Sequence, residues 1–266
     1  MSQQTINLPD LLALAHDMAD AAAQQTLPLF RQAPQVDNKH SDGFDPVTQA
    51  DRNAEQAIRQ IIESNCPEHA ILGEEYGAKA GNALQWVLDP IDGTRAFISG
   101  APSWGTLIAL NNDGAPLLGI LDQPFTGERY SACAGHGAFL AKDGHKTQLA
   151  TRACADLQEA IMATTTPDLF EDAQGTKIWQ AIRQTVRLTR YGGDCYNYAL
   201  LAAGHIDIVF EQGLQAYDIQ ALVPIVREAG GVVTDWQGGD PMQGGQIIAC
   251  GDARLHDKAL SLIGGL

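Results

Sequence analysis

The densest set of residues that could do chemistry is one stretch, Trp86-Val87-Leu88-Asp89-Pro90-Ile91-Asp92-Gly93-Thr94. A second acidic pair, Glu74-Glu75, lies upstream, and Asp218 lies far downstream. Carboxylate, carbonyl and water oxygens are the ligands that a hard cation such as Mg²⁺ requires. The stretch therefore predicts a metal site, in which a Pro90-Ile91 turn aims the carboxylates of Asp89 and Asp92 and the Ile91 carbonyl into one space.

The residues after this turn favour anion binding. Gly93 permits close approach to the backbone, and the amides of Gly93 and Thr94 are expected to open a helix toward Phe97. Isolated Asp-Pro and Asp-Gly pairs are more often ordinary turns with solvated acids. Here a hydrophobic run delivers the acids, and the chain has neither a P-loop nor a GxGxxG fingerprint. Cations and phosphate oxygens are thus predicted to share one pocket.

Helices and strands in the first part of the chain must position these acids. Apolar residues recur with helical spacing at 8–30 and 47–64, and the second helix places Asp51 near its N-terminus. Residues 31–46 are polar and predict a loop or a loose hairpin. Short apolar runs at 70–72 and 86–88 indicate buried strand ends, which is where sites of α/β proteins lie.

Two hairpins are predicted over residues 104–141, the first turning at Asp113-Gly114. Beyond residue 151 the pattern predicts strands at 160–164, 186–189, 206–210, 232–235 and 247–249, with helices near 178–185, 196–203, 217–229 and 256–263. The fold class is therefore mixed α/β (α+β), with an antiparallel sheet in the N-terminal half and a second sheet in the C-terminal half. Without a linker to mark it, a boundary near Ala150 divides the chain into residues 1–150 and 151–266, which should pack together.

Composition limits the partners. The 266-residue chain is 45% hydrophobic and carries 17 Lys and Arg against 32 Asp and Glu, a net charge of −15. This charge repels nucleic acid and anionic membranes, and a phosphate monoester could enter an acidic pocket only beside bound divalent ions. The five cysteines are scattered, which fits a reducing compartment, and the chain has neither a signal peptide nor an apolar run of about 18 residues. Together with the charge, these features predict a cytoplasmic protein that binds neither nucleic acid nor membrane.

Several motifs together resemble the signatures of the inositol monophosphatase superfamily: Asp89 to Thr94, Gly73-Glu74-Glu75, Asp45 through Asp51, Tyr217-Asp218, and Ala229 to Asp235. The resemblance runs from the first helix to the last strand. It implies a layered αβαβα sandwich, a homodimer, and hydrolysis of a small-molecule phosphate monoester. It also implies Mg²⁺ as the cofactor, two to three ions per site, with Mn²⁺ as an alternative and Li⁺ as an inhibitor.

Carried over to this chain, the resemblance implies a first metal ion on Glu74, Asp89 and the Ile91 carbonyl, and a second on Asp89, Asp92 and Asp218. A third, weaker ion would lie near Glu74. The implied catalytic groups are Thr94 and Asp51, which as a pair orient the attacking water, together with Glu74.

Two residues near the implied site keep more than one interpretation. Glu75 is either a support for the site or part of it. Lys39 stands where the family often has a lysine, but its spacing to Asp45 is one residue longer than expected, so a plain surface lysine is an equal alternative.

The residues after Thr94 depart from ordinary inositol monophosphatases, which tend to have a small or amide residue there. Arg95 to Gly100, Trp104 to Leu107, and Gly192 to Tyr198 resemble the histidinol-phosphatase branch instead. This implies L-histidinol phosphate as substrate and a place in histidine biosynthesis. An inositol or sugar monophosphatase is the nearest alternative. A non-catalytic metal-binding scaffold is the alternative from another class. Its mark would be the loss of Glu74, Asp89, Asp92, Thr94 or Asp218, and all five are present.

The chemistry of histidinol agrees with this branch, because Asp194 and Glu211 offer anionic partners for its amine and imidazole. The substrate-contacting residues are then Ile91, Asp92, Gly93, Thr94, Arg95, Gly193, Asp194 and Glu211. Asp194 could equally cap a helix that begins near Tyr196. Arg95 could reach phosphate or a neighbouring carboxylate, or support a subunit contact. None of the seven histidines has metal-ligand spacing, and Trp104 belongs to the core unless it lines the pocket.

Overall fold

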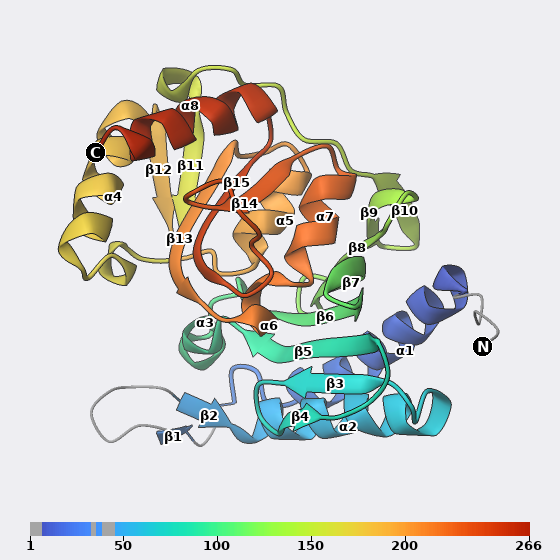
Figure 1. The fold of residues 1–266 in the computed structure, drawn as a ribbon. Coiled ribbons are helices and arrows are strands. Elements are labelled where there is room, and N and C mark those ends of the chain that lie inside the picture. The colour runs from blue at the N-terminus through green and yellow to red at the C-terminus, as the bar shows by residue number, and fades with distance from the viewer. Residues whose placement is uncertain (1–6, 33–35, 39–45) are drawn as a thin grey trace.

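The computed structural model describes residues 7–32, 36–38 and 46–266, so Lys39 and Asp45 lie outside the described residues. Helices and sheets stack in five layers, in the order helix, sheet, helix, sheet, helix (Figure 1). This confirms the predicted αβαβα sandwich. The helices are α1 (Leu8–Thr26), α2 (Gln49–Asn65), α3 (Thr94–Ser99), α4 (Ala173–Thr185), α5 (Tyr196–Ala202), α6 (Ala216–Ile219), α7 (Leu222–Glu228) and α8 (Ala253–Gly264).

The first large sheet has eight strands. Their spatial order is β10 (His145–Gln148), β9 (Gly137–Lys142), β8 (Glu128–Cys133), β7 (Ala115–Gln123), β6 (Gly105–Asn112), β5 (Leu84–Asp92), β3 (Ala70–Gly73) and β4 (Gly77–Lys79). Neighbouring strands are antiparallel, as predicted, except for the parallel pair β3 and β5. The predicted turn between β6 and β7 is confirmed: Asp113 and Gly114 both have positive φ angles, 48° and 83°, as tight hairpins require.

The second large sheet has five strands. Their order is β12 (Leu188–Tyr191), β11 (Ile161–Thr164), β13 (Ile208–Leu214), β15 (Gly245–Cys250) and β14 (Val232–Asp235). β11 runs parallel to β12 and β13, whereas β15 is antiparallel to both of its neighbours. A separate antiparallel pair, β1 (Val36–Asn38) and β2 (Pro46–Thr48), supports the hairpin interpretation of residues 31–46.

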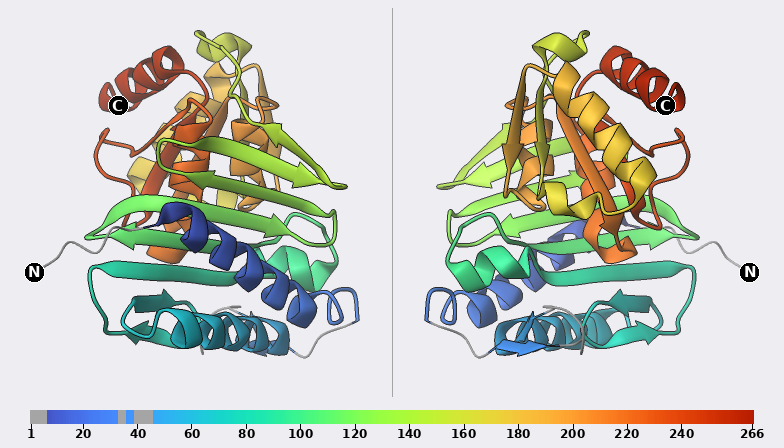
Figure 2. Two further views of the ribbon diagram at one scale, coloured as in Figure 1. Left: turned by 90° about the vertical axis from the view of Figure 1, so that its right-hand side faces the viewer. Right: turned by 90° about the vertical axis from the view of Figure 1, so that its left-hand side faces the viewer.

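Alternation along β5 shows how the layers are held together. Trp86 and Leu88 point to one face and pack against α1 and α2, whereas Val87 points to the other face and packs with α5, α7 and the second sheet. The outer face of the second sheet packs against α4 and α8. In both views of Figure 2 the N-terminal helix pair and α8 therefore lie at opposite ends of the molecule.

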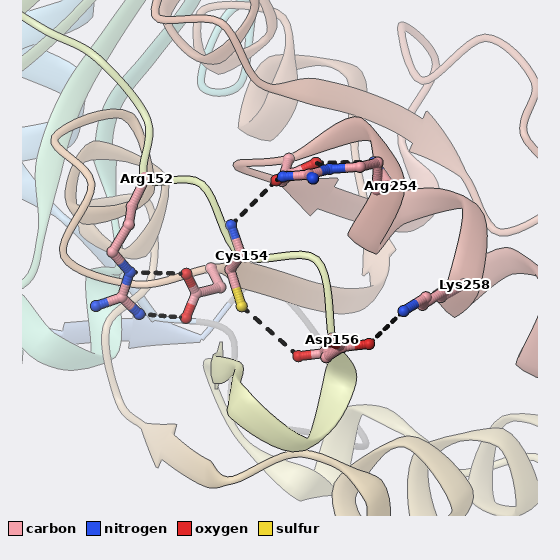
Figure 3. Close-up of polar contacts among 7 residues, drawn as sticks. Arg152, Cys154, Asp156, Arg254 and Lys258 are labelled. Atoms are coloured by element: carbon pink, nitrogen blue, oxygen red, sulfur yellow. Dashed lines mark hydrogen bonds and ion pairs between the residues drawn. The ribbon is translucent and has the colours of Figure 1, made fainter.

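The segment that connects the two sheets is fixed to the second half of the chain. Arg152 pairs with buried Asp207, with Nε 3.0 Å from Oδ1, and the amide of Cys154 donates to Asp252 at 3.1 Å. Figure 3 shows these contacts with that of Lys258 to Asp156. The first sheet ends at Gln148 and the second begins at Ile161, and a division of the chain near residue 150 stays a prediction.

Several bounds in the second half differ from the predictions, and two of these differences have a local cause. The predicted helix 217–229 is two helices, α6 and α7, because Pro224 has no N–H to donate to the carbonyl four residues before it. The strand predicted at 186–189 begins two residues later, since the amide of Val186 still bonds to α4. Within the described residues, none of the helices combines the length and the hydrophobicity that a membrane crossing requires.

Candidate active site

A bulge in β5 brings two aspartates to the same side of the sheet. In a regular strand, side chains three residues apart point to opposite faces. Asp89 pairs with Leu107 and Asp92 pairs with Gly105, so β5 has one residue more than β6 between these pairs. The extra residue lets both carboxylates reach one cluster.

The predicted Pro90-Ile91 turn is therefore wrong, because both residues lie inside β5. Pro90 has no N–H for the neighbouring strand, and this favours a bulge at its position. Thr106 Oγ1 donates to the Pro90 carbonyl at 2.8 Å and so satisfies an acceptor that the bulge leaves out of the ladder. The bulge, and not a turn, directs both carboxylates to the same side of the sheet.

Asp218 completes an acidic cluster with the two aspartates of β5. The carboxylate oxygens of Asp89, Asp92 and Asp218 lie within 4.8 Å of one another. α6 holds Asp218 in place through its first turn, where the amide of Gln215 donates to Asp218 Oδ2 at 2.6 Å. Residues more than 120 positions apart in the chain thus meet in one place.

Two more acids approach this cluster from the N-terminal half. The amide of Glu74 donates to the carbonyl of Leu88 at 3.2 Å, which places Glu74 beside Asp89. Asp51 lies in the first turn of α2 and is only 1% exposed. Both acids raise the pKa of Asp89, so their charges act on the same point.

Burial disfavours the charged forms of the three aspartates, and neighbouring acids add to this effect at Asp89 and Asp92. Burial raises the pKa of Asp89 well above its ordinary value, and Glu74, Asp92 and Asp218 raise it further. Burial and the charge of Asp218 do the same to the pKa of Asp92, and burial raises the pKa of Asp218 to about 6. A bound cation would reverse the local field and favour the ionised carboxylates.

The donor set fits a hard divalent cation. Oδ1 of Asp89 is buried and accepts no hydrogen bond from the described residues. Two oxygen ligands of one Mg²⁺ lie at most about 4.2 Å apart, close to the spacing of the three aspartates. All groups of the cluster offer oxygen, which Mg²⁺ and Mn²⁺ both accept.

α3 begins directly after β5, as predicted. Its N-cap, Gly93, has a φ of 82°, and a Cβ on Gly93 would lie 3.0 Å from the side chain of Asp194, so both conformation and space require glycine. Thr94 Oγ1 donates to the Ile91 carbonyl at 3.1 Å. This bond leaves the carbonyl a second lone pair for another ligand.

The loop before α5 reaches over to the cluster. The amide of Cys195 donates to Asp92 Oδ2 at 2.7 Å, and Ser103 Oγ donates to Asp194 Oδ2 at 3.1 Å. The N-cap of α5 is Cys195 and has no side-chain cap, so the cap interpretation of Asp194 is wrong. Gly193 has no room for a side chain, because a Cβ there would lie 1.9 Å from Asn197 Oδ1.

Glu211 lies on β13 and is 1% exposed. It accepts hydrogen bonds from the amide and hydroxyl of Thr165, at 2.8 and 3.0 Å. Burial raises the pKa of Glu211 to about 8, although these bonds oppose the shift. Glu211 and Asp194 line a cavity of about 110 Å³, and Asp92 and Asp218 line it too.

Two predicted residues with open roles are now placed. Burial raises the pKa of Asp194, and the charge of exposed Arg95 on α3 opposes this shift, which supports a position of Arg95 beside a neighbouring carboxylate. Trp104 is fully buried and packs against Phe30 and Phe97, with ring centroids 5.4 and 4.9 Å away, so it belongs to the core. The structure brings the other predicted site residues together around the cluster and the cavity.

Sequence reasoning missed Glu55, which supports the site from α2. Glu55 is fully buried and accepts hydrogen bonds from the amides of Glu75 and Tyr76, at 2.7 and 3.2 Å, so it fixes the turn that carries Glu74. A signal was present, since Asp51 and Glu55 are acids four residues apart within the apolar stripe of an amphipathic helix. The supporting groups on Ser103, Thr165 and Cys195 left no such signal.

Comparisons with known proteins agree with this geometry. A family model described as the inositol monophosphatase family matches residues 7–264. A chloroplastic bifunctional phosphatase of Arabidopsis thaliana is 40% identical over 93% of this chain and 73% of its own length. A histidinol-phosphatase of Chlorobaculum parvum is 36% identical over 96% of this chain and 97% of its own.

A solved structure of an inositol monophosphatase from Zymomonas mobilis has the same fold. Its TM-score is 0.86, with 46% sequence identity over 97% of this chain and 99% of that chain. The family match spans nearly all of the chain, including the β5 bulge and Asp218. The chain belongs to the inositol monophosphatase family of phosphatases.

Proposed function

We propose that this chain hydrolyses L-histidinol phosphate to L-histidinol and inorganic phosphate, a step of histidine biosynthesis, with Mg²⁺ as its cofactor. The observation that carries the proposal is a pair of carboxyl groups, that of buried Glu211 and that of partly buried Asp194, in a cavity directly beside the acidic cluster. An ester with a cationic alcohol matches that arrangement, because its phosphate and its nitrogen groups need opposite surroundings.

The cations of the proposed site would be held by the acidic cluster. Glu74, Asp89 and the Ile91 carbonyl would hold one ion, and Asp89, Asp92 and Asp218 a second, with a weaker third ion near Glu74. When bound, Mg²⁺ neutralises charge on the phosphoryl oxygens and acidifies water. Mn²⁺ is an alternative with the same ligand preference, and Li⁺ would inhibit.

The catalytic roles fall to residues at the N-termini of α2 and α3 and in the turn after β3. Thr94, whose hydroxyl is already anchored at the Ile91 carbonyl, would orient the attacking water together with Asp51, and Glu74 would face the same water. The water oxygen attacks phosphorus in line and gives up a proton, the bond from phosphorus to the alcohol oxygen breaks, and the alcohol oxygen takes up a proton in turn. The amides of Gly93 and Thr94 would contact the phosphate.

The alcohol part of the substrate would occupy the 110 Å³ cavity. Asp194 and Glu211 would face its ammonium and imidazole groups, with Gly193 allowing the loop to approach and Arg95 at the edge beside Asp194. A bound ammonium or imidazolium group would favour the ionised forms of both carboxyl groups, whereas a neutral polyol would bring no cation to offset their burial. Charge is therefore the property that the cavity selects.

An inositol monophosphatase is the second candidate, favoured by the 46% identity to the Zymomonas mobilis structure. The relative named histidinol-phosphatase favours the first. The test compares kcat/KM for L-histidinol phosphate and inositol 1-phosphate in Mg²⁺, with EDTA-treated enzyme as control. A preference of at least about a hundredfold for the histidinol ester supports the proposal, and a preference for inositol phosphate rejects it. A cytoplasmic homodimer stays part of the proposal.

A further inference from the structure

Tyr198 carries a polar group that the fold does not use. It lies in the first turn of α5, is 2% exposed, and packs in the core shared by the two sheets. Its hydroxyl oxygen is buried and has no hydrogen-bond partner among the described residues. A phenylalanine would fill the same space without that group.

A buried hydroxyl without a partner destabilises a folded protein by about 1–3 kcal/mol. Neighbouring tyrosines show the ordinary arrangement, since the hydroxyls of Tyr196 and Tyr130 both donate to Glu128. Tyr198 differs from them because it lines the cavity that holds Asp194 and Glu211. A group of this kind points to a ligand that completes its hydrogen bonding.

The surroundings of Tyr198 keep its hydroxyl group in the neutral form. Burial raises the pKa of Tyr198 well above its ordinary value, and the charges of Glu211, Asp92 and Asp218 raise it further. The phenol thus stays protonated. A protonated phenol keeps two lone pairs, so the unpartnered oxygen can accept an N–H from a ligand in the cavity that Tyr198 lines.

We infer that the Tyr198 hydroxyl is a specificity-determining group that accepts a hydrogen bond from an N–H of the nitrogen-bearing alcohol in the cavity. The inference rests on the proposed function and adds a third recognition group to Asp194 and Glu211. It predicts that the hydroxyl lowers the stability of the free protein and contributes to substrate selection. A hydroxyl with a purely structural role would instead stabilise the free protein and would not contribute to substrate selection.

The test is Tyr198→Phe in the full chain with Mg²⁺. We expect kcat/KM for L-histidinol phosphate to fall about tenfold, mainly through KM, the size of one hydrogen bond to a charged group. Hydrolysis of glycerol 2-phosphate, which has no N–H, should change less than about twofold. The thermal midpoint of the metal-free variant should be equal to or above that of the wild type.

Tyr196→Phe is the matched variant, because it removes a hydroxyl that is already bonded. Tyr196→Phe should lower the thermal midpoint and change kcat/KM for both esters by the same factor. The inference is overturned, while the proposed function stands, if Tyr198→Phe leaves kcat/KM for the histidinol ester unchanged, lowers kcat/KM for both esters equally, or lowers the thermal midpoint. If the wild type does not hydrolyse histidinol phosphate, the proposed function fails and this inference fails with it.

Discussion

The backbone amide of Cys195 donates a 2.7 Å hydrogen bond to Oδ2 of Asp92, joining residues 103 positions apart in the chain. Asp92 belongs to the acidic cluster, and Cys195 belongs to the loop that carries Asp194. One carboxylate therefore connects the phosphate end of the proposed site to its alcohol end. The effects of substitutions at the two ends can therefore be told apart only if the substitutions keep this hydrogen bond.

Asp92→Asn keeps that bond, because the amide oxygen of asparagine can still accept from Cys195. We expect kcat to fall on the order of a thousandfold, about 4 kcal/mol, since one charge of the proposed second cation site is lost. The thermal midpoint should not fall, because a repelling charge is also lost. Steady-state rates across a Mg²⁺ titration check this, and near-wild-type kcat at saturating Mg²⁺ would refute it.

Thr94→Ala separates water orientation from cation binding. The variant loses a hydroxyl but no carboxylate, so kcat should fall about a hundredfold while the Mg²⁺ concentration for half activation stays within about twofold. Thr94→Ser keeps the hydroxyl and should retain most of the rate. The role assigned to Thr94 is wrong if Thr94→Ala turns over at the wild-type rate once Mg²⁺ is saturating.

Glu55→Gln tests the support of the turn that carries Glu74. The amide of glutamine cannot accept from both Glu75 and Tyr76 as the carboxylate does, so the free energy of unfolding should fall by about 2 kcal/mol. More Mg²⁺ should be needed for half activation. Glu63→Gln on the same helix is the control, since that side chain is 53% exposed and should change stability by less than about 0.5 kcal/mol. Denaturant titrations that show the same loss of unfolding free energy for Glu55→Gln and Glu63→Gln would contradict this role of Glu55.

Glu211 should make stability depend on pH. Its folded-state pKa of about 8 lies above the ordinary 4.5, so the folded state holds a proton that the unfolded state has released. This contribution is complete below about pH 4.5 and is lost as pH rises toward 8, at no more than about 1.4 kcal/mol per pH unit. Glu211→Gln should lose less stability than the wild type over this range. If the free energy of unfolding has the same pH dependence in both proteins between pH 5 and about 8, Glu211 is not protonated in the folded state.

Much of the fold could be predicted because burial patterns are local. The alternation of Trp86, Val87 and Leu88 marks a strand with two buried faces, and helical spacing marks α1 and α2. β10 escaped prediction because its four residues are all exposed, so no alternation marks it. The break between α6 and α7 could have been predicted from Pro224, whose missing N–H acts locally.

The site was predictable in its residue types more than in its geometry. Asp89 and Asp92 were expected to flank a turn, because the pairing with β6 that creates the bulge is not visible along one strand. The hydrogen bond from Ser103 to Asp194 and the burial of Glu211 also depend on segments far apart in the sequence. Such contacts leave no periodic pattern, so the sequence could not decide between a cap and a ligand role for Asp194.

The central claim is that the cavity selects the positive charge of the leaving alcohol, and Asp194→Asn tests it most directly. Asparagine tolerates the left-handed backbone at this position, φ 45°, and can still accept from Ser103, so the loop should persist. kcat/KM for L-histidinol phosphate should fall about tenfold to a hundredfold while glycerol 2-phosphate barely changes, and exposed Asp257→Asn should leave both rates unaltered. Equal loss on both esters, or no loss on either, would contradict the account.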